Sequence, residues 1–256
     1  MVKADFKNTL IVLPIYNSEL QLEELFRRLS AVSDGMDVLC VNDGSSDNSL
    51  DMIEKYKLNH IDLEENRGKG FALKIGLAYA KINGYKFVIT IDSDLQHEPA
   101  CIPNFLKTQN KENADLVIGF RDFNPFWISS QTCKNKIHRL WKKGESEENS
   151  GTMPPMRILS NSITSFIVSS ITKRNILDSQ SGYRLYNLEL FDEEQIETDR
   201  YQMETEILLN YIRKNAVVAH VEIPIIYNDE KSYISHFRDI VNFVKVIADD
   251  FLGLRK

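Results

Sequence analysis

Short apolar runs alternate with segments of helical periodicity through the first half of this chain, and this alternation constrains the fold most strongly. The first run, Thr9–Pro14, is followed by Glu19–Ala31, where apolar residues recur at the spacing of one helix face. Further strands are predicted at Met36–Val41, Asn59–Leu63, Lys86–Ile91 and Ala114–Gly119. Strands alternating with helices in this way indicate an α/β fold with a mostly parallel sheet that helices cover on both faces.

Polar clusters follow the predicted strands at the point where each strand ends. They occupy Pro14–Glu19, Asn42–Asp47, Asp92–His97 and Gly119–Arg121. The carboxyl ends of parallel strands share one edge of a sheet, and ligands of such folds bind beyond that edge. The sequence therefore predicts a binding site built from these four loops.

Charge and cysteine content exclude several classes of protein. The formal net charge of −6 argues against a general nucleic-acid binder. Cys40, Cys101 and Cys133 are scattered and lack metal-ligand spacing, which is typical of a reducing, cytoplasmic setting. No window of about 18 apolar residues, the length needed to span a bilayer, occurs in the chain. We therefore expect a soluble protein or one that lies on a membrane surface.

Asp92 and Asp94 stand one residue apart directly after a predicted strand. Residues i and i+2 of a strand point the same way, so the two carboxylates would approach one spot. Mg²⁺ and Mn²⁺ prefer oxygen ligands, and Gln96 could add a carbonyl oxygen or orient a water. The alternative is that Asp94 caps a turn and Asp92 is solvated.

Six motifs occur in an order and at spacings that resemble the family 2 glycosyltransferases, in particular their dolichol- and polyprenyl-phosphate branch. They are PIYNSE (Pro14–Glu19), VNDGSSDNS (Val41–Ser49), NRGKGFALKIGL (Asn66–Leu77), DSDLQHEP (Asp92–Pro99), GFR (Gly119–Arg121) and DSQSGYR (Asp178–Arg184). Each motif alone is weak, whereas all six together are specific. The resemblance covers Thr9 to Tyr227.

The resemblance implies a single GT-A domain over residues 1–256, with a Rossmann-like sheet. Residues 1–121 would bind a nucleotide sugar, and residues 122–256 would form the acceptor side. The residue pattern itself predicts helices in this second part at Arg157–Lys173, Tyr201–Lys214 and Ser235–Leu252, after a mobile loop at about 122–156. The implied reaction is the inverting, metal-dependent transfer of a sugar, with Mg²⁺ or Mn²⁺ as cofactor and a UDP- or GDP-sugar as donor.

The resemblance also implies which residues line the donor site. They are Pro14, Tyr16, Asn17, Glu19, Asp43, Lys69, Asp92 and Ser93. Glu19 would reach the ribose or base, and Asp43 would accept from a ring N–H of uracil or guanine. The family often has two aspartates here, whereas this chain has Asn42 before Asp43. Lys69 at a helix start would favour phosphate, although a plain tight turn explains the same residues.

The catalytic residues implied by the resemblance are Asp92, Asp94, Arg121, Asp178 and Arg184. Asp92 would lie near the sugar or ribose, and Asp94, with Gln96, would bind the metal. Arg121 matches the arginine of a G-S-R motif, which reads GFR here. Arg121, Arg157 and Arg184 are candidates for anion contacts, with a surface salt bridge as the alternative for each. Lys231 and His236 could close over the diphosphate, although His236 could also be an ordinary helix-start residue.

The acceptor decides whether the reaction needs a general base. A sugar hydroxyl would need one, for which Asp178, Glu204 and Glu206 are candidates, whereas a lipid phosphate arrives ionised and needs only cations. The segment Phe126–Lys143 interleaves apolar residues with cations, which suits peripheral contact with an anionic membrane or a solvated loop. We expect a polyprenyl phosphate acceptor, with a glycan hydroxyl as the alternative.

Two other classes of function share some of these features. A nucleotidyltransferase would normally carry a glycine-rich basic loop after its first strand, and PIYNSE differs from that pattern. A non-catalytic nucleotide-binding relative would be free to lose Asp94, Arg121 and Arg184, which are all present here. Glycosyl transfer is therefore the expected activity.

Overall fold

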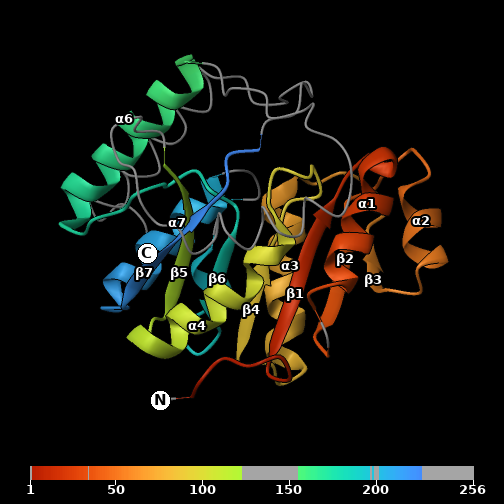
Figure 1. Cartoon of the computed structure of the whole chain (residues 1–256), viewed down its shortest axis with the longest axis horizontal. Coiled ribbons are helices and arrows are strands. Elements are labelled where there is room, and N and C mark those ends of the chain that lie inside the picture. The colour runs from red at the N-terminus through yellow and green to blue at the C-terminus, as the bar shows by residue number, and fades with distance from the viewer. Residues whose placement is uncertain (1, 34, 123–154, 197, 199–201, 227–256) are drawn as a thin grey trace.

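A seven-stranded sheet in the order β3-β2-β1-β4-β6-β5-β7 forms the centre of this computed structural model. The structure describes residues 2–33, 35–122, 155–196, 198 and 202–226. The strands are β1 Thr9–Ile15, β2 Asp37–Asn42, β3 Asn59–Asp62, β4 Phe87–Thr90, β5 Leu116–Arg121, β6 Arg184–Asn187 and β7 Val218–Ile223. Figure 1 shows them in this order from right to left.

Strand β6 is antiparallel to both of its neighbours, β4 and β5, and the other strand pairs are parallel. In the register, Leu185 of β6 faces Ile89 of β4 on one side and Val117 of β5 on the other. The predicted mostly parallel α/β sheet is confirmed, with this one strand reversed.

Six α-helices flank the sheet in the described part of the chain. They are α1 Glu19–Ser30, α2 Ser49–Lys55, α3 Lys69–Ile82, α4 Ile102–Glu112, α6 Pro155–Thr172 and α7 Gln202–Arg213. Short 3₁₀ turns occupy Pro99–Cys101 and Glu193–Gln195. Helix α6 stands at the upper left in Figure 1, and α1 and α2 lie at the right.

Each face of the sheet carries its own apolar core because alternate residues of a strand point to opposite faces. Val12 of β1 joins a cluster that includes Leu73 of α3 and Ile207 of α7. Leu13 joins the other cluster, which includes Leu25 of α1. Every residue of β1 is buried, so this strand is covered on both sides.

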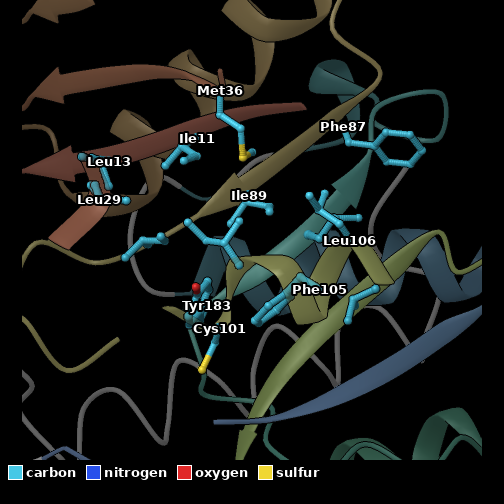
Figure 2. Packing of buried hydrophobic residues seen from close by; sticks show 14 of the residues in the cluster. Ile11, Leu13, Leu29, Met36, Phe87, Ile89, Cys101, Phe105, Leu106 and Tyr183 are labelled. Carbon is cyan, nitrogen blue, oxygen red and sulfur yellow. The ribbon is translucent and has the colours of Figure 1, made fainter. Parts of the chain in front are cut away.

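The second cluster anchors the segment that leads into β6. Tyr183 is fully buried, and its ring stacks on Phe105 of α4 with the ring centroids 4.4 Å apart. Figure 2 shows these two rings beside Cys101 and below Ile89. The hydroxyl of Tyr183 donates to the Glu98 carbonyl at 3.2 Å. Packing therefore holds the DSQSGYR segment against the start of α4.

The later helices agree with their predicted positions to within two residues at each end where they are described. Helix α6 runs Pro155–Thr172 and α7 runs Gln202–Arg213. The helix predicted at Ser235–Leu252 and most of the loop predicted at 122–156 lie outside the described residues. None of the described helices is both long and apolar enough to cross a membrane.

Candidate functional site

Loops from three strands are tied together at the carboxyl edge of the sheet. The Asn17 backbone N–H donates to Ser45 Oγ at 3.0 Å, and Asn17 Oδ1 accepts from the Ser46 N–H at 2.8 Å. The hydroxyls of Ser18 and Ser93 lie 2.9 Å apart. These bonds join the loops after β1, β2 and β4, so the predicted meeting of the polar clusters is confirmed for these loops.

The residues expected to line the donor pocket differ in exposure. Tyr16 is 40% exposed, which leaves its ring face available for stacking, whereas Pro14 is buried inside β1. Glu19 Oε2 accepts from the Asn48 N–H at 2.8 Å, which ties the start of α1 to the start of α2. Asn17 and Glu19 therefore hold the loop after β2 in place.

Asp43 connects the end of β2 to the start of α3. Its two carboxylate oxygens accept from the backbone N–H groups of Arg67 at 2.9 Å and Gly68 at 2.8 Å. A Cβ on the neighbouring Gly44, which has φ of 63°, would lie 2.5 Å from the Glu65 carbonyl carbon. The two loops are thus packed backbone to backbone, and Asp43 fixes the position of Lys69 at the helix start.

The Asp92–Asp94 pair begins a tight turn after β4. Asp94 Oδ1 accepts from the Gln96 N–H at 2.9 Å, and Leu95 has a left-handed φ of 62°. The Asp92 N–H donates to Nδ1 of His97 at 3.2 Å, which requires the neutral ring. Burial lowers the pKa of His97 to about 4, so this ring stays neutral at physiological pH.

Asp92 forms an ion pair rather than being solvated. Its Oδ1 lies 2.7 Å from Nζ of Lys69. Burial opposes ionisation of Asp92, but the neighbouring Lys69 charge prevails and lowers the pKa of the carboxyl group. The two aspartates consequently have different surroundings, since Asp92 is paired with a lysine and Asp94 belongs to the turn.

A second carboxylate, from Glu204 in the first turn of α7, reaches the same lysine. Glu204 Oε1 lies 3.3 Å from Lys69 Nζ. Burial raises the pKa of Glu204, although Lys69 and Arg184 oppose that effect. A Cβ on Gly182 would lie 2.6 Å from Lys69 Nζ and 2.9 Å from each carboxylate oxygen of Asp92. The glycine of SGYR therefore packs directly against the ion pair.

Arg121 and Asp178 form a buried bidentate pair at the end of β5. Arg121 Nε lies 2.7 Å from Asp178 Oδ2, and a terminal guanidinium nitrogen lies 3.1 Å from Oδ1. The side chain of Asp178 is 0% exposed. Burial opposes the charge on Arg121, but Asp178 outweighs it and raises the pKa of the guanidinium. Asp178 therefore orients the guanidinium of Arg121 through two hydrogen bonds.

Arg184 was predicted to contact an anion, but its guanidinium contacts the protein backbone. It is fully buried, and its guanidinium donates to the carbonyl oxygens of Ser181 at 2.8 Å, Glu204 at 2.6 Å and Ser179 at 2.8 Å. A guanidinium enclosed by three carbonyls is directed at the protein backbone. We correct the expectation accordingly: Arg184 positions the DSQSGYR loop against α7.

Glu206, the third candidate base, bonds to Thr198. Residues two apart on a helix lie on different faces, and Glu206 Oε2 accepts from Thr198 Oγ1 at 2.6 Å. The Arg157 side chain, Lys231, His236 and the basic stretch Lys134–Lys143 lie outside the described residues. The sequence analysis gave no individual role to two residues of the site, His97 and Gly182, although they lie in the motifs DSDLQHEP and DSQSGYR.

The residues present fit a metal that shares its coordination with phosphates. The described residues contain no group of three or more His, Cys, Asp or Glu side chains that could hold an ion. Asp92 is paired with Lys69, which leaves Asp94 as the carboxylate that the turn presents. Mg²⁺ is often bound by one or two carboxylates together with substrate phosphates, so a single carboxylate matches such a site.

A family model described as "Glycosyl transferase family 2" matches residues 10–193, which is most of the chain. The chain belongs to glycosyltransferase family 2. The matched region contains all six quoted motifs and the whole Lys69–Asp92 and Arg121–Asp178 geometry.

Curated relatives of this family 2 glycosyltransferase come from archaea and bacteria. An uncharacterized protein of Methanocaldococcus jannaschii is 28% identical over 88% of this chain and 91% of its own length. An uncharacterized glycosyltransferase of Synechocystis is 38% identical over 48% of this chain and 41% of its own length. The likeness to the cyanobacterial protein therefore covers only part of each chain.

Solved structures share the fold of this glycosyltransferase at low sequence identity. Glucosyl-3-phosphoglycerate synthase from Mycobacterium tuberculosis, in complex with Mn²⁺, uridine diphosphate and phosphoglyceric acid, matches with a TM-score of 0.67. The identity is 16%, and the match covers 96% of this chain and 78% of that one. A second mycobacterial protein matches with a TM-score of 0.69 and 14% identity, over 95% and 74% of the two chains. The GT-A architecture is thereby confirmed.

Proposed function

We propose that this family 2 glycosyltransferase transfers a sugar, with inversion, from a nucleoside diphosphate sugar to a phosphate-bearing acceptor, most simply a polyprenyl phosphate. The single observation that carries the acceptor class is the buried Arg121–Asp178 pair. A hydroxyl acceptor would need a carboxylate as its base, but both oxygens of Asp178 are bonded to Arg121. The guanidinium of Arg121 instead provides a cation that could bind an acceptor phosphate.

The donor side of the proposal rests on the loops after β1, β2 and β4. Tyr16 offers an exposed side chain for stacking, and buried Asp43 fixes the loop that leads into α3. The backbone N–H groups at the start of α3 would supply partial positive charge for the diphosphate, and Lys69 in the same turn is paired with Asp92. A solved structure with this fold contains uridine diphosphate and Mn²⁺, which supports a nucleotide ligand for this chain.

Asp94 would hold a divalent metal, Mg²⁺ or Mn²⁺, with Gln96 contributing through a water or its carbonyl oxygen. Such an ion, when bound, neutralises charge that develops on the leaving diphosphate. The Asp94 carboxylate is already fixed by the Gln96 N–H, so it needs little reorganisation to act as a ligand.

The assignment of a phosphate acceptor depends on whether any carboxylate near the site could serve as a general base. Both oxygens of Asp178 bond to Arg121, Glu204 lies against Lys69, and Glu206 bonds to Thr198. Within the described residues, each of these three candidates is thus engaged with another group. An acceptor that arrives ionised avoids the need for a base, and a phosphate monoester meets this condition.

The reaction then proceeds in one displacement. An oxygen of the acceptor phosphate forms a bond to the anomeric carbon as the bond from that carbon to the diphosphate oxygen breaks. The electron pair leaves with the nucleoside diphosphate, and no proton is transferred. Arg121 stabilises the acceptor phosphate, and Asp92, held by Lys69, faces the donor sugar. Peripheral contact with a membrane would bring the lipid acceptor to this edge.

The test begins with calorimetric titration of the protein with UDP and GDP, each with and without Mn²⁺. We expect one nucleotide to bind in a manganese-dependent way, followed by transfer of its sugar to a short-chain polyprenyl phosphate. Transfer to the matching polyprenol or to a glycan, at a rate equal to or above that of the phosphate, would overturn the acceptor assignment. Nucleotide binding without sugar transfer to any acceptor would favour a non-catalytic nucleotide-binding relative, and absence of binding by either nucleotide would overturn the donor assignment.

A further inference from the structure

We propose that Glu204 is a positioning residue of the donor site, which acts through Lys69 to hold the Asp92 carboxylate in place. The inference rests on the proposed function, since it takes Asp92 to face the donor sugar. It assigns part of the donor site to α7, a helix that lies more than 130 residues from Lys69 in the sequence. The donor site is therefore completed by the acceptor half of the chain.

Three side chains form a chain of charges that runs from the protein interior to the site. The side chain of Glu204 is 8% exposed, that of Lys69 is 19% exposed and that of Asp92 is 24% exposed. Lys69 Nζ lies between the two carboxylates, 2.7 Å from Asp92 Oδ1 and 3.3 Å from Glu204 Oε1. Glu204 is thus the most buried of the three side chains, and Asp92 is the most exposed.

The backbone around Glu204 is held as firmly as its side chain. Its carbonyl oxygen accepts from Arg184 at 2.6 Å, and Arg184 also holds the carbonyls of Ser179 and Ser181. Gly182, in the same loop, fills the space beside Lys69 and Asp92. The guanidinium of Arg184 therefore fixes the backbone of Glu204, which pairs with Lys69. It also fixes the loop around Gly182, against which the Lys69–Asp92 pair packs.

A lysine needs two anchors to be placed accurately. Its ammonium is a point charge on a flexible four-carbon stem, and one ion pair leaves much of that freedom. A second carboxylate on the inner side confines Nζ to the space between the two acids. Loss of that anchor would let Lys69 move and Asp92 turn with it, and small misplacements at a reacting centre cost up to about 100-fold in rate.

The experiment compares Glu204→Gln with Glu206→Gln. Both residues are buried acids of α7; Glu204 pairs with Lys69, whereas Glu206 accepts from Thr198. We expect Glu204→Gln to lower kcat by about 10- to 100-fold with little change in the Kd of the nucleoside diphosphate. Glu206→Gln should retain kcat within a few-fold. In a Lys69→Met background, Glu204→Gln should have almost no further effect, because it has no lysine to act on.

A second readout does not depend on activity. Competitive reductive methylation with isotopic formaldehyde, followed by peptide mass spectrometry, reports how accessible the Lys69 amine is. We expect labelling of Lys69 to rise several-fold in Glu204→Gln and to stay at the wild-type level in Glu206→Gln. Unchanged labelling in Glu204→Gln would overturn the inference, whether or not the protein transfers a sugar.

The readouts separate the failure of this inference from failure of the proposed function. If wild-type protein transfers no sugar but Lys69 labelling changes as expected, the proposed function fails and the positioning role stands. If Glu204→Gln does not fold, Glu204→Asp retains the charge on a shorter arm and takes its place. That variant should show intermediate labelling and intermediate kcat, and wild-type values for both would contradict the inference.

Discussion

The Arg121 guanidinium and the Asp178 carboxylate meet through two bonds, of 2.7 Å and 3.1 Å, at the point where β5 ends and the DSQSGYR loop begins. The side chain of Asp178 is fully enclosed, whereas that of Arg121 retains 10% exposure. A buried carboxylate with both oxygens bonded to one arginine is suited to orienting that arginine. The pair therefore presents a fixed positive charge to the site.

We predict that Asp178→Asn lowers the free energy of unfolding by about 3 kcal/mol or more, because it leaves the buried Arg121 without its counter-charge. The double variant Arg121→Met/Asp178→Asn should be more stable than Asp178→Asn alone, since it removes both charges. Urea denaturation of the variants measures these differences. Losses that simply add in the double variant would show that the two residues are not energetically coupled.

We predict that Asp94→Asn abolishes manganese-dependent nucleotide binding while the protein stays folded. The substitution removes the charge that a divalent ion requires and keeps an oxygen that can accept from the Gln96 N–H. Calorimetric titration with and without Mn²⁺ measures the effect, and circular dichroism checks the fold. Asp51→Asn, at an exposed position of α2, is the matched control and should bind as wild type does. Manganese-dependent binding by Asp94→Asn would remove Asp94 from the metal site.

We predict that Gly182→Ala reduces turnover by about tenfold or more at a small cost in stability. The new methyl group would meet Lys69 Nζ and the Asp92 carboxylate, which are the movable ends of side chains, so the ion pair shifts and the fold remains. Gly84→Ala gives the opposite pattern. Its φ is 83° with open space around it, so it should lose about 1 kcal/mol without losing activity. Equal effects on turnover would refute this role of Gly182.

We predict that Arg184→Lys destabilises the protein by about 2–4 kcal/mol, because an ammonium cannot reach three carbonyls that are arranged around a planar guanidinium. Thermal denaturation and urea titration measure the loss. The same substitution at exposed Arg174 should change stability by less than about 0.5 kcal/mol. A stable Arg184→Lys protein with impaired phosphate binding would instead restore the anion-contact role.

We predict that the lowered pKa of His220 contributes to the loss of stability at acidic pH. Burial lowers its pKa to about 4, and its Nε2 accepts from the Leu177 N–H, which requires the neutral ring. Because an unfolded histidine has a pKa near 6.5, the unfolded state binds more protons between pH 6.5 and pH 4, and stability falls as the pH drops through that range. We expect the loss between pH 7 and pH 5 to be about 1–2 kcal/mol smaller in His220→Gln, measured by urea denaturation. Identical losses would contradict the assignment.

The sequence predicted the layout of residues 1–121 well because the elements of this part of the chain follow local patterns. The apolar runs at Thr9–Pro14 and Met36–Val41 correspond to β1 and β2 with shifts of one residue at their ends. The polar clusters were placed correctly at one edge of the sheet, since parallel strands share their direction. The position of each strand and helix can be read from the apolar periodicity of about a dozen consecutive residues.

Long-range pairing could not be predicted in the same way. The strand Arg184–Asn187 is only four residues long and lies directly after SGY, so no alternation marks it as a strand. Arg184 belongs to a motif that suggested phosphate contacts, yet its partners are carbonyls contributed by the loop and by α7. The pairing of Lys69 with Glu204 likewise joins helices that no spacing rule relates. Such contacts are set by tertiary packing.

The reversed strand β6 has a consequence for how the protein is made. It forms the link between β4 and β5, which both precede it by more than 60 residues in the sequence. On a ribosome, β1 to β4 can assemble early, but one edge of β4 and both edges of β5 stay unpaired until β6 and β7 emerge. Exposed strand edges invite pairing with other chains. Synthesis of the second half therefore both completes the site and closes a period of vulnerability to aggregation.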